Sequence, residues 1–157
     1  MNLRDILFRN SVIIDLKKKS KEKVLRDLSI FISSIHNISD PESIVSGILS
    51  REEETSTGIG FGIAVPHYRT GLVDKIHLVV ARCNDGIDFD ALDDKPVNLI
   101  FMLIVPKDQS KSYQNVLQAI SGIMLFDTVR TKLLDAETTD DFIKILSDGD
   151  EAYSSSK

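Results

Sequence analysis

The segment Pro96 to Pro106, PVNLIFMLIVP, is apolar at almost every position and shows little polar alternation. A strand with one face in water alternates apolar and polar residues, whereas a strand covered on both faces is a nearly continuous apolar run. The segment therefore predicts a central strand that is covered on both faces of its sheet. This prediction constrains the fold strongly, because other parts of the chain must supply two covering layers.

Helices can supply both layers, since apolar residues recur at helical spacing before and after this strand. Two of these segments begin at capping residues, Ser20 and Asp40, and Pro41 takes the first helical position of the second. The segments with helical spacing are Ser20–Ile35, Asp40–Glu54, Lys111–Met124, Thr128–Leu134 and Thr139–Leu146. Two further strand-like runs are Ser11–Asp15 and Asp74–Cys83. The pattern predicts an α/β domain with helices on both faces of the sheet.

A single domain over residues 1–147 fits a chain of 157 residues, which is long enough to bury a substantial core. The remaining residues, 148–157, are rich in serine and acidic side chains. We expect them to form a flexible C-terminal tail.

Charge and cysteine content exclude several classes of function. The net charge of −5 argues against nucleic acid as a partner, and we interpret the basic cluster Lys17–Lys23 as a solvated helix start. No apolar run reaches the roughly 18 residues that cross a bilayer, and the charged N-terminus lacks the apolar core of a signal peptide. The single cysteine, Cys83, suits a reducing compartment. We therefore expect a cytoplasmic protein without membrane insertion.

The segment Ser56–Thr70, STGIGFGIAVPHYRT, alternates glycine with other residues before a histidine. It fits neither a dinucleotide fingerprint, since Ile63 stands where the third glycine belongs, nor a P-loop. Glycine permits close approach of a ligand to backbone N–H groups, and consecutive N–H groups form an anion nest. The segment predicts an anion site that begins near Gly58, although a glycine-rich hairpin with an incidental His67 remains the alternative.

The chemistry that suits His67 is nucleophilic. The chain has no pattern typical of a metal site and no Gly-x-Ser-x-Gly elbow, so we expect neither a metal nor another cofactor. A histidine that holds a phosphoryl group needs donors for the phosphate oxygens, and arginine binds them in pairs. Arg51 is the candidate, whereas Arg69 follows an apparently exposed turn and is expected to face solvent or a partner.

Two segments, SREEETSTGIGFGIAVPHYRT and GIDFDALDDKPVNLIFMLIVPKDQSKSY, resemble the enzyme IIA domain of the fructose/mannitol family of the bacterial phosphotransferase system. The similarity is greatest to the stand-alone, nitrogen-related regulatory form. The resemblance implies one domain with a mixed sheet between helices. It also implies that His67 accepts phosphate from the small histidine-containing phosphocarrier protein and passes it to a IIB partner.

The resemblance also assigns roles by position. It makes His67 the phosphoacceptor and Arg51 a phosphate-stabilising residue, with Ser56 and Thr57 in the same pocket. Many members carry a second histidine at the start of the helix after the last apolar strand, and this chain has Tyr113 there. The departure affects onward transfer more than acceptance at His67.

Three functions stay open. The first is a phosphocarrier with a regulatory role, the second is a sugar-specific IIA subunit, and the third is a regulatory binding protein that senses phosphorylation state without passing phosphate on. For a transient docking surface we expect the apolar residues near the histidine, Ile59, Phe61 and Tyr68. The other histidines, His36 and His77, and the thiol of Cys83 are interpreted as structural.

Overall fold

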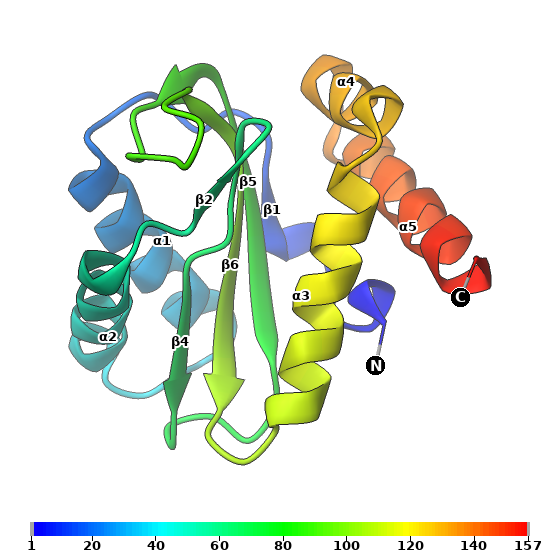
Figure 1. The fold of residues 1–157 in the computed structure, drawn as a ribbon. Coiled ribbons are helices and arrows are strands. Elements are labelled where there is room, and N and C mark those ends of the chain that lie inside the picture. The colour runs from blue at the N-terminus through cyan, green and yellow to red at the C-terminus, as the bar shows by residue number, and fades with distance from the viewer. Residues whose placement is uncertain (1, 157) are drawn as a thin grey trace.

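A six-stranded sheet separates two helical layers in the computed structural model, which describes residues 2–156 (Figure 1). The strands are β1 (Val12–Ile13), β2 (Gly58–Gly60), β3 (Ile63–Ala64), β4 (His67–Thr70), β5 (His77–Ile87) and β6 (Val97–Pro106). Their order is β1-β5-β6-β3-β2, and β4 also pairs with β6. Parallel and antiparallel pairs coexist, so the sheet is mixed. The predicted α/β class, with a mixed sheet between helices, is confirmed.

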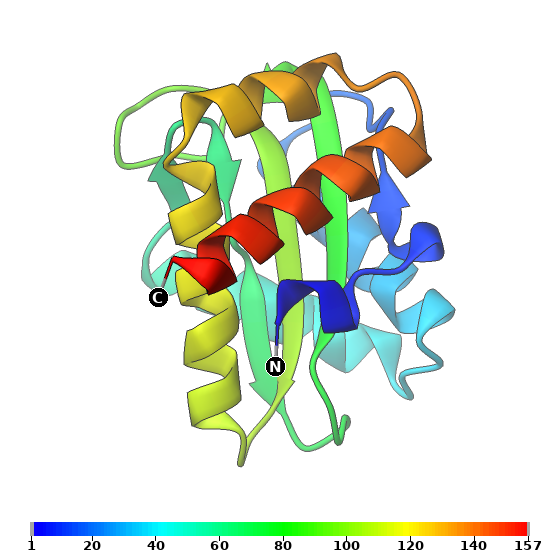
Figure 2. The ribbon, with the colours of Figure 1, turned by 90° about the vertical axis from the view of Figure 1, so that its right-hand side faces the viewer.

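The central strand predicted from the apolar run is β6. Alternate residues of β6 enter two separate cores, with Phe101 and Leu103 on one face and Ile100 and Met102 on the other. Helices α1 (Lys21–Ile35) and α2 (Pro41–Glu54) cover the second face. Figure 2 shows α3 (Ser110–Met124), α4 (Asp127–Asp135) and α5 (Thr139–Ser155) on the opposite layer, beside the N-terminal 3-10 turns η1 (Leu3–Ile6) and η2 (Arg9–Ser11).

The predicted helix starts agree with the capping contacts. The Ser20 side chain accepts a hydrogen bond from the backbone N–H of Lys23, and the Asp40 side chain accepts one from Ser43. Each contact satisfies a backbone donor that the first helical turn leaves unpaired. These caps fix where α1 and α2 begin, and α2 ends at Glu54, as its sequence indicates.

The C-terminal residues differ from the flexible tail expected over 148–157, because α5 continues to Ser155. Asp150 is 1% exposed and accepts hydrogen bonds from the backbone N–H and the Nε of Arg4, at 3.1 and 3.0 Å. Tyr153 lies against Gly122, where a Cβ atom would come within 2.3 Å of its ring. The polar sequence of this segment gives no indication of these contacts, because the partner residues are far away along the chain.

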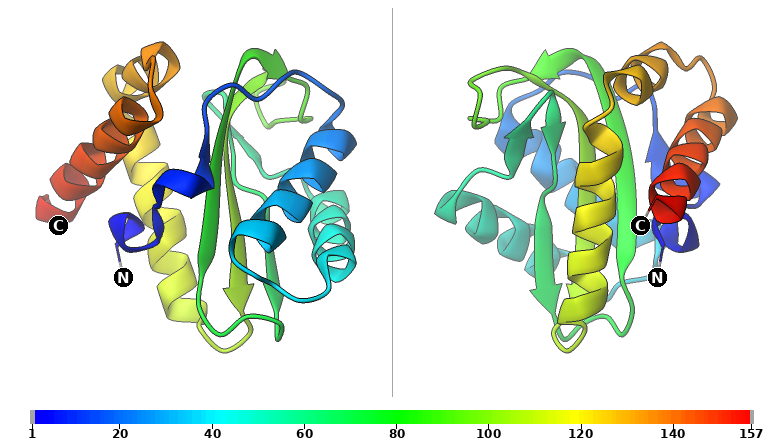
Figure 3. Two further views of the ribbon diagram at one scale, coloured as in Figure 1. Left: turned by 180° about the vertical axis from the view of Figure 1, so that it is seen from behind. Right: turned by 45° about the vertical axis from the view of Figure 1, so that its right-hand side comes forward.

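Arg82 ties the two ends of the domain to the sheet. The side chain is buried in β5, where its Nε donates to the Ile14 carbonyl at 3.0 Å. Its Nη1 donates to the carbonyls of Leu133 and Ala136, at 2.8 and 2.6 Å. One guanidinium therefore holds the segment after β1 and the end of α4 against β5. Figure 3 shows from two further sides that the sheet lies between α1 and α2 on one face and the C-terminal helices on the other.

Two histidines that the sequence assigned to structure stack on each other. The ring centroids of His36 and His77 lie 4.4 Å apart, and the Nε2 of His36 is buried without a hydrogen-bond partner. Burial lowers the pKa of both imidazoles, and that of His77 falls to about 4, with His36 and Lys75 lowering it further and Asp74 opposing. Both rings are therefore neutral in the folded protein near neutral pH. Cys83, also assigned to structure, is fully buried.

We predict that acid destabilises the fold through this pair. Since the folded-state pKa lies below the ordinary value of about 6.5, the unfolded chain binds more protons, and the contribution is lost as pH falls from that value toward the folded pKa. The substitution His77→Phe keeps a stacked ring and removes one titrating group. Its urea midpoint should fall less than that of the wild type between about pH 7 and about pH 5. An equal decrease of the urea midpoint in His77→Phe and in the wild type would contradict the prediction.

Candidate functional site

A pocket of about 460 Å³ lies between the end of α2, strand β4 and the start of α3. The residues that line it are Gly47, Ser50, Arg51, Glu54, His67, Tyr68, Arg69 and Tyr113. Gly47 leaves room for the neighbouring ring of Tyr68, because a Cβ atom there would lie 2.3 Å from the ring. The structure thus brings together three residues singled out by the sequence, His67, Arg51 and Tyr113.

His67 is the first residue of β4 and pairs with Leu103 of β6. Its Nδ1 lies 2.9 Å from the carbonyl oxygen of Val65. Because a carbonyl oxygen only accepts, Nδ1 carries the proton of the neutral ring and Nε2 keeps its lone pair. Burial lowers the pKa of His67, and Arg51 lowers it further. The ring is therefore a neutral nucleophile at Nε2.

Two arginines line the pocket together with this ring. Arg51 lies in the last turn of α2, where its Nη1 donates to the Thr55 carbonyl at 3.0 Å. Arg69 lies in β4 and its Nη2 donates to the Lys107 carbonyl at 2.6 Å and to Ser110 Oγ at 2.8 Å. Each guanidinium has further N–H groups beyond those used in these bonds, and they can donate hydrogen bonds to phosphate oxygens.

Arg69 is exposed, as the sequence predicts, but it also lines the pocket beside His67, which the sequence did not indicate. The segment HYRT was interpreted as an exposed turn, but it is strand β4 and pairs in parallel with β6. Parallel pairing with a distant strand leaves no local signal in the sequence. Sequence reasoning therefore missed a second arginine in the pocket.

Tyr113 faces His67 from the first turn of α3, and their ring centroids lie 5.3 Å apart at 46°. Burial raises the pKa of the Tyr113 hydroxyl, while Arg51 and Arg69 oppose that shift. The hydroxyl is therefore uncharged near neutral pH and can donate one hydrogen bond. Tyr113 thus supplies a neutral donor to the pocket.

The structure does not bring Ser56, Thr57 and Gly58 into this pocket. Ser56 Oγ donates to the Phe89 carbonyl at 2.6 Å and accepts from the Gly58 N–H at 3.1 Å. Thr57 is buried and bonded to Glu52. Since the Gly58 N–H is already used, the predicted anion nest does not form there, and these residues hold the loop instead.

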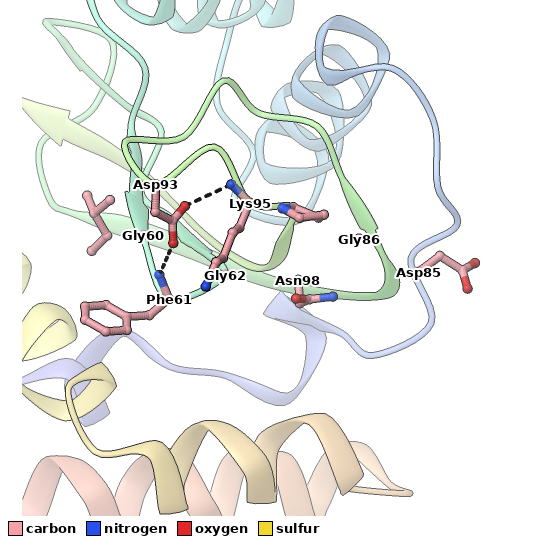
Figure 4. Close-up of a pocket in the computed structure, with 10 residues that line it drawn as sticks. Gly60, Phe61, Gly62, Asp85, Gly86, Asp93, Lys95 and Asn98 are labelled. Carbon is pink, nitrogen blue, oxygen red and sulfur yellow. Dashed lines mark hydrogen bonds between the residues drawn. The ribbon is translucent and has the colours of Figure 1, made fainter.

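The other glycines of the segment border a different, larger pocket of about 660 Å³ (Figure 4). Gly60, Phe61 and Gly62 all have positive φ, and the Phe61 N–H donates to Asp93 at 3.2 Å. This glycine pattern therefore makes a tight turn rather than a phosphate cradle. Ile59 and Phe61, predicted to flank the histidine, line this other pocket, whereas Tyr68 lies in the pocket of His67.

Within residues 2–156, no three His, Cys, Asp or Glu side chains gather in a way that would hold a metal ion. In the same part of the chain, no helix combines the length and hydrophobicity needed to cross a membrane. The expectation that the protein needs no metal or other cofactor stays a prediction.

Comparison with known proteins gives a family match over almost the whole chain. Residues 5–149 match the family described as "Phosphoenolpyruvate-dependent sugar phosphotransferase system, EIIA 2". A fructose-specific EIIA component from Haloferax volcanii is 39% identical over 77% of this chain and 77% of its own length. A nitrogen regulatory protein from Pseudomonas aeruginosa is 30% identical over 94% of this chain and 96% of its own. The chain spans only 24% of a fructose-specific EIIABC component from Bacillus subtilis, at 29% identity over 96% of this chain.

Solved structures share the fold. The nitrogen regulatory protein IIA-Ntr from Neisseria meningitidis superposes with a TM-score of 0.86 and 27% identity, covering 92% of this chain and 98% of its own. The IIA subunit in a complex of mannitol IIA with phosphorylated mannitol IIB, from Escherichia coli, gives a TM-score of 0.77 at 21% identity over 90% of this chain and 96% of its own. At that identity, the second likeness concerns the fold alone.

We predict that Arg51→Met raises the pKa of His67, because the guanidinium charge disfavours a second positive charge beside it. The measurement is an NMR titration of the His67 ring. Arg9→Met is the matched control, since the Arg9 side chain is 77% exposed and pairs with Asp140. A His67 pKa that stays at the wild-type value in Arg51→Met would show that the two charges do not interact.

Proposed function

The chain belongs to the EIIA 2 family of the phosphoenolpyruvate-dependent sugar phosphotransferase system, and we propose that His67 is the residue on which it carries a phosphoryl group. One observation supports this assignment most strongly. The Val65 carbonyl takes the Nδ1 proton of His67, so Nε2 is the nucleophilic atom in a pocket lined by Arg51 and Arg69. A neutral imidazole beside two guanidinium groups suits attack on a phosphoryl group.

The transfer proceeds in line. The Nε2 lone pair of His67 forms a bond to phosphorus while the phosphorus–nitrogen bond of the donor phosphohistidine breaks, and that electron pair returns to the donor ring. Positive charge on the phosphorylated His67 ring is stabilised by the hydrogen bond from Nδ1 to the Val65 carbonyl. Arg51 and Arg69 bind the oxygens, over which the negative charge spreads.

The proposed donor is the small histidine-containing phosphocarrier protein, and the proposed acceptor is a IIB protein. The complex of mannitol IIA with phosphorylated mannitol IIB supports the acceptor, and the donor is the one that the sequence resemblance implies. Successive partners must use the same pocket, so each interface is small and transient. We propose the cytoplasm as the place where these partners meet.

A regulatory role remains a second proposal, because a nitrogen regulatory protein aligns with almost the whole chain. Tyr113 favours it over a purely sugar-specific role. A neutral hydroxyl stabilises the negative charge on the phosphoryl oxygens in the transition state less than an imidazolium would, which slows delivery to IIB more than it slows acceptance. A protein that keeps its phosphate can report phosphorylation state to a regulated target.

We predict that incubation with phosphoenolpyruvate and the upstream phosphocarrier proteins adds one phosphoryl group, seen by intact mass. The label should be acid-labile and base-stable, and His67→Ala should not acquire it. His77→Phe serves as the control and should label like the wild type, because His77 lies outside the pocket. Labelling of the His67→Ala protein at another histidine would overturn the assignment.

We predict that Tyr113→His speeds loss of phosphate from His67 to a cognate IIB protein. An imidazolium donor forms a charge-assisted hydrogen bond, about twice as strong as the neutral one from tyrosine. Tyr113→Phe should slow the step only slightly, since one neutral donor is lost. Single-turnover loss of label, compared across the three proteins, is the measurement. An unchanged or lower rate in Tyr113→His would make Tyr113 a packing residue.

A further inference from the structure

Glu52 is a charged residue held inside the protein next to the phosphoryl pocket. Its side chain is 5% exposed and lies 3.0 Å from the Nζ of Lys21. The two carboxylate oxygens accept from the Thr57 N–H at 2.7 Å and from Thr57 Oγ1 at 2.6 Å. A buried carboxylate is costly unless it is paired and hydrogen-bonded, and both oxygens of Glu52 are used. Glu52 therefore ties the end of α2 to the loop that contains Thr57.

Backbone hydrogen bonds extend this tie to the phosphoacceptor. The Thr57 carbonyl accepts from the Val65 N–H at 3.0 Å. The carbonyl of Val65 then accepts from Nδ1 of His67 at 2.9 Å. Thr57 and Val65 thus connect the Glu52 carboxylate with His67, and the Val65 carbonyl oxygen is the atom that sets the tautomer of the ring.

The hairpin between Thr57 and Val65 is short. Strands β2 and β3 contain three and two residues, and their register shifts between Gly58 and Gly60. Such short strands hold their geometry only when other contacts support them. Pairing with β6 supports β3 on one side. The bonds from Glu52 to Thr57 support the other side, at the base of the hairpin.

The last turn of α2 also carries Arg51, one position before Glu52. Adjacent side chains on a helix diverge by about 100°, so Arg51 enters the pocket while Glu52 reaches the loop. The same helical turn therefore holds both a phosphate ligand and the support of the nucleophile. Any motion of α2 moves both together.

We propose that Glu52 is a positioning residue for phosphoryl transfer: through Thr57 and the Val65 carbonyl it holds His67 in the tautomer and orientation that present Nε2 to the phosphoryl group. The inference rests on the function proposed for His67. Glu52 lies outside the pocket and makes no hydrogen bond to His67, so it orients the ring through the loop. Its charge also raises the pKa of His67, against the larger lowering by burial.

The first test reads the tautomer of His67 in the unphosphorylated protein by ¹⁵N NMR of the ring nitrogens. The wild type should show the Nδ1–H form alone. Glu52→Gln replaces one accepting oxygen by an N–H₂ group that faces the donors of Thr57 and Lys21, so the two His67 nitrogen shifts should move toward each other. Glu53→Gln is the matched control, because Glu53 is exposed on the same helix and should leave the shifts unchanged.

The second test measures phosphorylation kinetics with the phosphocarrier donor. Glu52→Gln should lower the maximal rate about tenfold, because misplacement of a nucleophile by a fraction of an ångström is costly. The donor KM should stay the same, since Glu52 is buried and does not line the pocket of His67. Thr57→Ser keeps the hydroxyl and should behave as the wild type, whereas Thr57→Val should share the defect.

A slower Glu52→Gln protein with the wild-type His67 tautomer would overturn the proposal, as would a wild-type rate. If Glu52→Gln does not fold, the same two measurements are made on Thr57→Val and Thr57→Ser. A wild-type rate or a wild-type His67 tautomer in Thr57→Val would then overturn the proposal. The tautomer experiment needs no phosphate, so it stands apart from the labelling of His67. Absence of label on the wild-type protein would therefore contradict the proposed function alone.

Discussion

Strand β6 is the element on which the remaining structure depends. It pairs along one edge with β5, and along the other with β3 and then with β4. Its two faces enter different cores, so each helical layer packs on the same strand. The pairing of His67 with Leu103 places the proposed phosphoacceptor at a fixed height along β6. A shift of register in this strand would therefore move His67 and both cores at once.

The site forms where elements from both layers approach the edge of this sheet. Arg51 comes from α2 on one side, Tyr113 comes from α3 on the other, and His67 and Arg69 come from β4 between them. The side chain of His67 is only partly buried and lines the pocket, so its ring remains accessible to a partner. Burial is still sufficient to keep the imidazole neutral. Access and nucleophilicity are thus obtained at the same position.

The sequence predicted those features that depend on local patterns. The apolar run of β6 indicated a sheet covered on both faces, and the caps at Ser20 and Asp40 located two helices. Features that depend on distant partners were missed or misplaced. Arg69 enters the pocket only because β4 pairs with β6, and α5 is longer than expected because Asp150 meets Arg4. The glycines indicated a phosphate cradle, but their positive φ angles serve a turn.

The contacts of Arg82 and Asp150 have a consequence for local opening of the domain. Arg82 binds carbonyls at positions 68, 51 and 54 residues away along the chain, and Arg4 is bonded to Asp150 across 146 residues. Release of α5 would remove the bonded carboxylate of Asp150 from Arg4, and release of α4 would remove two of the three carbonyls that Arg82 binds, so opening at either end is costly. We therefore expect the first and last segments of the chain to open together in hydrogen exchange.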